Sequence, residues 1–143
     1  MLNRNRQTTL KRTGESTELA SFFSRPETQT SRLTSFRLSV IVPAYNERHV
    51  VEASLRRVLA LEDDLISSLE VIVVDDCSTD GTWPILERLA KEDSRIVLLR
   101  NERNLGKGAA LRKAIPCTTG DVTIIHDADL EYDPSDIPSL LVP

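Results

Sequence analysis

Histidine, cysteine and long apolar segments are all scarce in this chain of 143 residues. The two histidines, His49 and His126, do not stand at a metal-binding spacing, and no Gly-x-Ser-x-Gly turn accompanies them. A histidine-based zinc site and a hydrolase triad are therefore excluded. The two cysteines, Cys77 and Cys117, form no Cys-x-x-Cys pair, so we interpret them as free thiols in a reducing compartment.

No apolar run approaches the roughly 20 residues of a membrane-spanning helix, which predicts a soluble chain. The net charge of −4 is unevenly distributed: residues 1–37 carry seven Lys or Arg against three Asp or Glu, and residues 38–143 carry eleven against nineteen. The acidic part argues against a nucleic-acid partner, because a phosphate backbone requires a basic face. A ligand with phosphate groups would need a metal or a few well-placed cations.

Residues 1–37 are rich in Arg, Ser and Thr and show no helical or strand periodicity. This composition predicts a disordered basic extension. A flexible arm that touches anionic lipid is an alternative. An organelle transit peptide is another, although Glu15, Glu18 and Glu27 argue against it.

The remainder of the chain, residues 38–143, has the pattern of an α/β domain. Four short apolar runs, at residues 38–42, 71–74, 96–99 and 122–125, are typical of strands buried on both faces of a parallel sheet. Helical patterns lie between them, with Asn46, Asp80 or Thr82 as possible caps. The alternation predicts a doubly wound sheet in which the first and fourth strands are neighbours. A ligand is then expected at their carboxyl ends.

Three acidic residues at alternate positions, Asp127, Asp129 and Glu131, follow the fourth run. In an extended chain such residues point to one side. Two carboxylates about 4 Å apart repel by about 4 kcal/mol at an effective dielectric of about 20, so the group favours a bound cation. Oxygen ligands select Mg²⁺ or Mn²⁺. A solvated acidic turn is the alternative.

Two further stretches could contact an anionic or polar ligand. Asp75 and Asp76 end the second run and could accept hydrogen bonds from a base or a ribose, unless they only cap a helix. Gly106, Lys107 and Gly108 precede a helix, where backbone N–H groups and an ammonium could meet an anion. The spacing is neither that of a P-loop nor that of a dinucleotide fingerprint, and an ordinary helix start would also explain it.

Taken in order, these stretches resemble the motifs of family 2 glycosyltransferases. They are Ile41-Val42-Pro43-Ala44-Tyr45-Asn46-Glu47, Val74-Asp75-Asp76-Cys77-Ser78-Thr79-Asp80-Gly81-Thr82, Asn104-Leu105-Gly106-Lys107-Gly108-Ala109-Ala110 and Asp127-Ala128-Asp129-Leu130-Glu131. The chain is most similar to the dolichol-phosphate mannosyltransferase and polyprenyl-phosphate glycosyltransferase group, a match that residues 132–138 sharpen.

The resemblance implies a GT-A fold, which is Rossmann-like with a doubly wound, mostly parallel sheet. It also implies inverting transfer of a hexose from a donor of the GDP-mannose or UDP-glucose type to an acceptor such as polyprenyl or dolichyl phosphate. Asp127 and Asp129 would be catalytic and, with Glu131, would hold Mg²⁺ or Mn²⁺. The donor would contact Pro43, Ala44, Tyr45, Glu47, Asp75, Asp76, Lys107 and Ala128.

Two differences from the family qualify what the resemblance implies. Glu131 stands where mannosyltransferase relatives often have Gln, which leaves the donor open. Family members also continue beyond the fourth strand, so we expect a truncated domain that needs a C-terminal half or a partner chain. A non-catalytic nucleotide-sugar-binding module is the alternative function. A phospho-receiver domain is disfavoured, because the acidic pair follows the second strand. The expected location is the cytoplasm, at the membrane face where a lipid phosphate is presented.

Overall fold

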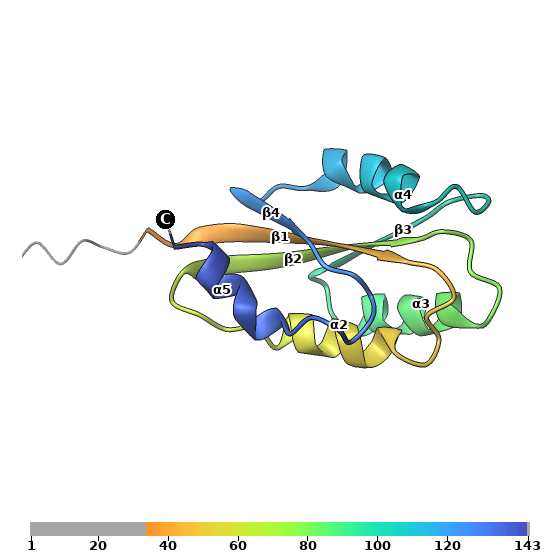
Figure 1. Ribbon diagram of the computed structural model, residues 1–143, viewed down its shortest axis with the longest axis horizontal. Helices are drawn as coiled ribbons and strands as arrows, with labels where there is room; N and C mark the ends of the chain where they lie inside the picture. Colours follow the sequence, from red (N-terminus) through yellow and green to blue (C-terminus); the bar gives the residue numbers. More distant parts are fainter. Residues whose placement is uncertain (1–33, 143) are drawn as a thin grey trace, which may run out of the picture. The chain divides into compact units, whose positions relative to one another are not determined.

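Residues 34–142 are described by a computed structural model, in which helices cover both faces of a four-stranded sheet (Figure 1). The strands are β1 (Phe36–Ala44), β2 (Ile66–Asp75), β3 (Ile96–Arg100) and β4 (Val122–Ile125). The α-helices are α2 (Val51–Leu59), α3 (Thr82–Glu92), α4 (Lys107–Ala114) and α5 (Ile137–Leu140), with 3₁₀ turns η1 (Ile115–Cys117) and η2 (Pro134–Asp136). The disorder predicted for the N-terminal extension falls largely on residues 1–33, which lie outside the described residues.

The strand order is β3-β2-β1-β4, and all three pairings are parallel. Ile41 illustrates the arrangement, because it pairs with Ile72 on one side and with Ile125 on the other. The prediction that the first and fourth strands are neighbours is confirmed. The chain therefore winds in opposite directions from β1, and the carboxyl ends of β1 and β4 lie side by side.

Alternate side chains of the central strands pack into two separate cores. Val40 and Val42 face α2 and α3, where they meet Leu55 and Leu86. Ile41, on the opposite face, belongs to a smaller cluster formed with α4. Figure 1 shows α2 and α3 beneath the sheet and α4 above it. Both faces of β1 and β2 are buried. Their sequences are therefore continuous apolar runs rather than alternating ones.

The first strand begins two residues before the apolar run that predicted it. β1 begins at Phe36, whose N–H donates to the Leu65 carbonyl oxygen at 2.7 Å. Arg37 continues the strand, and its Nη2 donates to Asp121 Oδ1 at 2.8 Å just before β4. The apolar run begins only at Leu38, because Arg37 is polar, so the run does not reveal where the strand starts.

Neither predicted helix cap stands at the N-cap position, which for α3 is Gly81, although Asp80 does contact the first residue of that helix. Asp80 Oδ1 accepts from the Thr82 N–H at 3.0 Å at the start of α3. Asn46 does not cap α2, which begins five residues later at Val51. Asn46 instead has a positive φ of 51°, and its Oδ1 accepts from the Thr79 N–H at 2.9 Å. Its side chain therefore links the loop after β1 to the loop after β2.

None of the helices within residues 34–142 combines the length and the apolar character needed to cross a membrane.

Candidate active site

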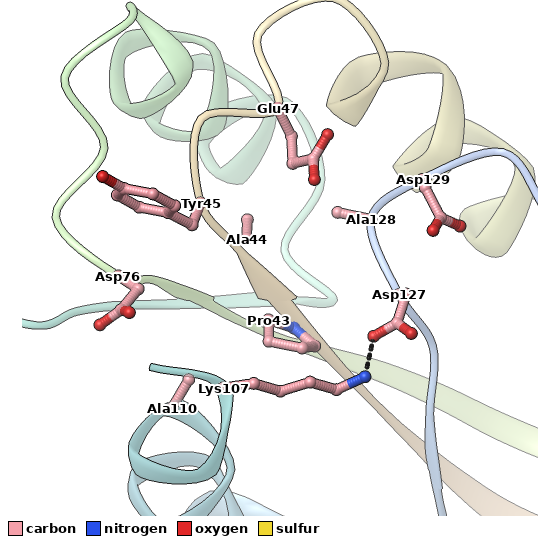
Figure 2. Close-up of a pocket in the computed structure, with 10 residues that line it drawn as sticks. All are labelled: Pro43, Ala44, Tyr45, Glu47, Asp76, Lys107, Ala110, Asp127, Ala128 and Asp129. Carbon is pink, nitrogen blue, oxygen red and sulfur yellow. Dashed lines mark hydrogen bonds and ion pairs between the residues drawn. The ribbon is translucent and has the colours of Figure 1, made fainter. Parts of the chain in front are cut away.

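A pocket of about 370 Å³ opens at the carboxyl ends of β1 and β4 (Figure 2). Its wall is formed by Pro43, Ala44, Tyr45, Glu47, Asp76, Lys107, Ala110, Asp127, Ala128 and Asp129. The loop after β1 and the acidic stretch after β4 are about 80 positions apart in sequence, yet they face each other here. The topology expected from the sequence produces this meeting, since β1 and β4 are adjacent.

The acidic stretch does not have the extended geometry that its alternating pattern suggested. Regular strand structure ends at Ile125, and the chain bends from Ala128 onward. Glu131 donates its backbone N–H to Asp129 Oδ1 at 3.2 Å, and its own side chain is exposed outside the pocket wall. The prediction of three carboxylates on one side of a strand is therefore wrong. Within residues 34–142, no group of three or more His, Cys, Asp or Glu side chains is arranged to hold a metal.

Glu47 adds a carboxylate from the loop after β1 to those of Asp127 and Asp129. Burial raises the pKa of Glu47, and the charges of Asp129, Asp80 and Asp127 raise it further. Figure 2 shows Glu47, Asp127 and Asp129 around Ala128, with the Asp129 side chain on the other side of the ribbon from Ala128. The concentration of negative charge favours a cation at this end of the sheet.

Lys107 supplies the cation on the opposite wall, from the first residue of α4. Its Nζ lies 2.5 Å from Asp127 Oδ1, the ion pair drawn in Figure 2. Both side chains remain partly exposed, at 54% and 37%. The pair is therefore open to solvent and accessible to a ligand that carries charges of its own.

Asp76, by contrast, is bonded to neighbouring loop residues. Only 4% of its surface is exposed, and its oxygens accept from Asn101 Nδ2 at 2.7 Å and from the N–H groups of Leu105 and Gly106 at 2.9 and 2.7 Å. Burial by itself would raise the pKa of Asp76, but these hydrogen bonds outweigh it and lower the pKa. The carboxylate is thus held in its charged form at the pocket wall.

Asp75 does not reach the pocket. It is fully buried, and its Oδ2 accepts from the Ser78 N–H and from Arg100 Nε, both at 3.1 Å. Its Oδ1 has no hydrogen-bond partner among residues 34–142. The Arg100 guanidinium also lies 4.6 Å from the centre of the Trp83 ring, a cation–π contact. Through Ser78, Asp75 therefore helps to hold the loop after β2 in place. Its contact with a nucleotide stays a prediction.

Sequence reasoning missed one residue of the pocket wall, Ala110. Ala110 ends the motif that begins at Asn104, but no ligand contact was predicted for it, and it is fully buried. Ala110 stands three residues after Lys107, which places both on one side of α4. That spacing is the signal that could have identified it.

The model of glycosyl transferase family 2 matches residues 39–142. This chain belongs to glycosyl transferase family 2. The match covers β2, β3, β4, the part of β1 from Ser39 onward and every residue of the pocket wall. The resemblance inferred from the ordered motifs is confirmed.

Known members of the family agree with the match. An undecaprenyl-phosphate 4-deoxy-4-formamido-L-arabinose transferase of Aeromonas hydrophila subsp. hydrophila is 39% identical over 105 residues, which are 73% of this chain and 32% of the relative. The same enzyme from Pseudomonas syringae pv. syringae is also 39% identical, over 73% of this chain and 31% of the relative. This family 2 chain thus spans about a third of the length of these curated relatives.

Solved structures confirm the GT-A fold over the described strands. The mannosyltransferase PcManGT from Pyrobaculum calidifontis, solved with GDP-Man and Mn²⁺, superposes with a TM-score of 0.63 at 31% identity. The superposition covers 84% of this chain and 35% of PcManGT. S. aureus TarS 1-349, solved with UDP-GlcNAc, gives a TM-score of 0.61 at 30% identity, over 73% of this chain and 30% of TarS.

Proposed function

We propose that the pocket binds the diphosphate and sugar of a nucleotide-sugar, and that the domain takes part in inverting transfer of a hexose to a lipid phosphate. The observation that carries the proposal is the meeting of the loop after β1, the start of α4 and the stretch 127–129 in one pocket. Family membership supports it, as do the GDP-Man and UDP-GlcNAc ligands of the two solved neighbours.

The residues present fit a divalent metal that is shared with a diphosphate. Asp127 and Asp129 offer only oxygen ligands, which suit Mg²⁺ or Mn²⁺. Magnesium is commonly held by one or two carboxylates, with substrate phosphates and waters completing its coordination. The absence of a third protein ligand in the described part of the chain is therefore compatible with such a site. Mn²⁺ is present in PcManGT, and Glu131 stays a prediction as a further ligand.

The charged residues of the pocket wall leave an excess of negative charge. Glu47, Asp127 and Asp129 would repel a diphosphate, and Lys107 alone is too little to offset three carboxylates. A metal ion, when bound, would neutralise charge on the diphosphate as it leaves. Lys107 would add a second positive contact by exchanging part of its bond with Asp127 for a phosphate oxygen.

The remaining wall residues would place the nucleoside and the sugar. Tyr45 is 44% exposed at the pocket and offers a ring face on which a base can stack. Pro43, Ala44 and Ala128 have short side chains that leave room for the ligand. Donors of the GDP-mannose and UDP-glucose types are both proposed.

The acceptor proposed is a polyprenyl or dolichyl phosphate presented at a membrane surface. The names of the curated relatives, which specify undecaprenyl phosphate, support this choice. A phosphate monoester has a second pKa of about 6 and is largely ionised near neutral pH. Its oxygen can therefore attack without a general base, and the described residues need not supply one.

Transfer is tested by incubating the protein with Mn²⁺, undecaprenyl phosphate in detergent and radiolabelled GDP-mannose or UDP-glucose. We expect labelled lipid from one donor. Asp127→Asn or Asp129→Asn should lower the rate by about a hundredfold or more, the scale of losing one preorganised electrostatic contact. Asp64→Asn is the matched control, because Asp64 is exposed in the loop before β2, away from the pocket wall.

A non-catalytic nucleotide-sugar-binding module is the second candidate, because a pocket wall with carboxylates and one lysine could hold a nucleotide-sugar and its metal without transferring the sugar. Metal-dependent nucleotide binding without any transfer would support it over the enzyme. If neither nucleotide binding nor transfer is found, both candidates fail.

A further inference from the structure

We propose that Thr82 is a positioning residue, whose buried hydroxyl fixes the loop after β1 so that the Glu47 side chain lies on the pocket wall. Thr82 is the first residue of α3 and does not line the pocket itself. The sequence pattern indicates only a helix cap at this position. The effect on nucleotide binding rests on the function proposed above, whereas the effect on the loop can be measured without any ligand.

The loop after β1 presents three consecutive N–H groups, those of residues 46 to 48, to side-chain oxygens at and just before the start of α3. The acceptors, in order, are Ser78 Oγ at 2.9 Å, Thr82 Oγ1 at 2.9 Å and Asp80 Oδ2 at 3.1 Å. Successive N–H groups beside a residue of positive φ, such as Asn46, can form a concave site for an anion. Here the oxygens of the chain itself accept from these groups, which ties the two loops together.

Thr82 is the most deeply buried of the three acceptors, with no exposed surface. Its hydroxyl donates to Asp80 Oδ1 at 2.6 Å, and its N–H donates to the same oxygen at 3.0 Å. A hydroxyl has one hydrogen and two lone pairs. Since the hydrogen is committed to Asp80, a lone pair is left for the Glu47 N–H. The orientation of the Thr82 hydroxyl is therefore fixed by both partners.

Glu47 is held through its backbone on both sides. Its N–H donates to Thr82 Oγ1 at 2.9 Å, and its carbonyl oxygen accepts from the N–H groups of Val50 and Val51 at 3.0 and 2.9 Å, where α2 begins. From this fixed backbone the Glu47 side chain extends toward Ala128 on the pocket wall (Figure 2). A loop released from Thr82 would let the carboxylate move away from the wall.

These bonds take over where the strand pairing ends. β1 pairs with β2 as far as Ala44 and Asp75, and the Asp76 N–H donates to the Ala44 carbonyl oxygen at 2.8 Å. From Asn46 onward, side-chain acceptors join the two loops, and in the reverse direction the Thr79 N–H donates to Asn46 Oδ1 at 2.9 Å. A single substitution can remove such an acceptor, so the tie can be tested one residue at a time.

The ligand-free test is NMR on ¹⁵N-labelled Thr82→Val and Thr82→Ser. Valine is similar to threonine in shape but lacks the hydroxyl, which serine keeps. In Thr82→Val we expect the Glu47 amide proton to move upfield and to exchange with solvent at least about threefold faster, because its acceptor is lost. Thr82→Ser should remain close to the wild type. An unchanged Glu47 amide in a folded Thr82→Val protein would overturn the proposal.

Thr123→Val is the matched control. It makes the same chemical change at an exposed position of β4, away from the pocket wall. We expect the Glu47 amide proton of this variant to keep its wild-type shift and exchange rate. A change as large as that in Thr82→Val would mean that the Glu47 amide does not report on Thr82, and would overturn the proposal.

The test with ligand is the affinity for Mn²⁺ with GDP or UDP, whichever the wild type binds. Thr82→Val should weaken binding by about three- to tenfold, the scale of one hydrogen bond, because the loop must then be ordered when the nucleotide binds. Thr82→Ser should restore the affinity. A merely structural role would lower the free energy of unfolding without changing the affinity of the folded protein. Wild-type affinity in folded Thr82→Val would therefore overturn the proposal.

A double-mutant cycle with Glu47→Ala tests whether Thr82 acts through Glu47. If it does, adding Thr82→Val to Glu47→Ala changes the affinity no further. If Thr82→Val weakens binding by the same factor with and without the Glu47 side chain, Thr82 acts elsewhere and the proposal fails.

Two outcomes need a second variant or readout. If Thr82→Val does not fold, Asp80→Ala takes its place, because Asp80 orients the Thr82 hydroxyl, and the same shift of the Glu47 amide and the same cycle are expected. An unchanged Glu47 amide would then overturn the proposal. If the wild type binds neither nucleotide, the proposed function fails, and the NMR signal of Glu47 still decides the role of Thr82.

Discussion

At the scale of single residues, the charged side chains of this domain divide into two kinds. Glu47, Asp127 and Asp129 lie close enough to raise one another's energy, a cost that a bound cation would relieve. Asp121 and Asp93, away from the pocket, each have a pKa lowered to about 2 by an arginine neighbour. The first kind suits ligand binding, and the second suits stability.

The Asp121 pair leads to a prediction about acid. Its carboxylate accepts from the Arg37 side chain and from the Arg37 N–H, which together hold its folded pKa at about 2. Since the folded pKa is depressed, the stabilisation is present above the unfolded value of about 4 and is lost as the pH falls to about 2. As the pH falls from about 4 to about 2, we expect the free energy of unfolding to decrease less in Asp121→Asn than in the wild type. The effect should be small, because the pair is exposed.

Urea unfolding at several pH values between 4 and 2, followed by the fluorescence of Trp83, measures this directly. A pH dependence identical in wild type and Asp121→Asn would show that Arg37 and Asp121 do not interact in solution.

At the scale of elements, the strands were predictable and the loops were less so. Apolar runs identify β1 to β4 and their parallel pairing, because a strand buried on both faces must be apolar throughout. The positions of Asn46 and Asp76 depend instead on residues from other loops, Thr79 and Gly106, that no local pattern reveals. The bend from Ala128 onward was missed for the same reason.

Gly120, in the loop before β4, lies close to β1, and this contact leads to a prediction about stability. A Cβ at Gly120 would lie 2.6 Å from Ser39 Oγ and 2.7 Å from the Arg37 carbonyl oxygen. Gly120→Ala should therefore destabilise the fold by about 1–3 kcal/mol, the usual cost of overpacking. Gly108, inside α4, is the matched control, because a Cβ there meets only Arg112 Nη1 at 3.5 Å.

Gly108→Ala should instead stabilise the protein by up to about 1 kcal/mol, since alanine favours a helix over glycine. Thermal unfolding of both variants gives the comparison. Equal stabilities would contradict the close contact between Gly120 and β1.

At the scale of the whole molecule, the sheet order creates the site. With β1 between β2 and β4, the carboxyl ends of three strands carry the loop after β1, Asp76 and the stretch 127–129 to one edge. Helix α4 then places Lys107 and Ala110 against that edge from the other face (Figures 1 and 2). Four of the nineteen acidic residues in the stretch 38–143 thus lie on the pocket wall.

Calorimetric titration of the wild type with GDP and with UDP, in Mn²⁺ and again in EDTA, tests the central claim most directly. We expect one nucleotide to bind with Mn²⁺ and its affinity to fall by at least about tenfold in EDTA, because three carboxylates would then face the diphosphate with Lys107 as the only compensating charge of the pocket wall. Equal affinity in the two buffers, or no binding in either, would contradict a metal-assisted diphosphate site.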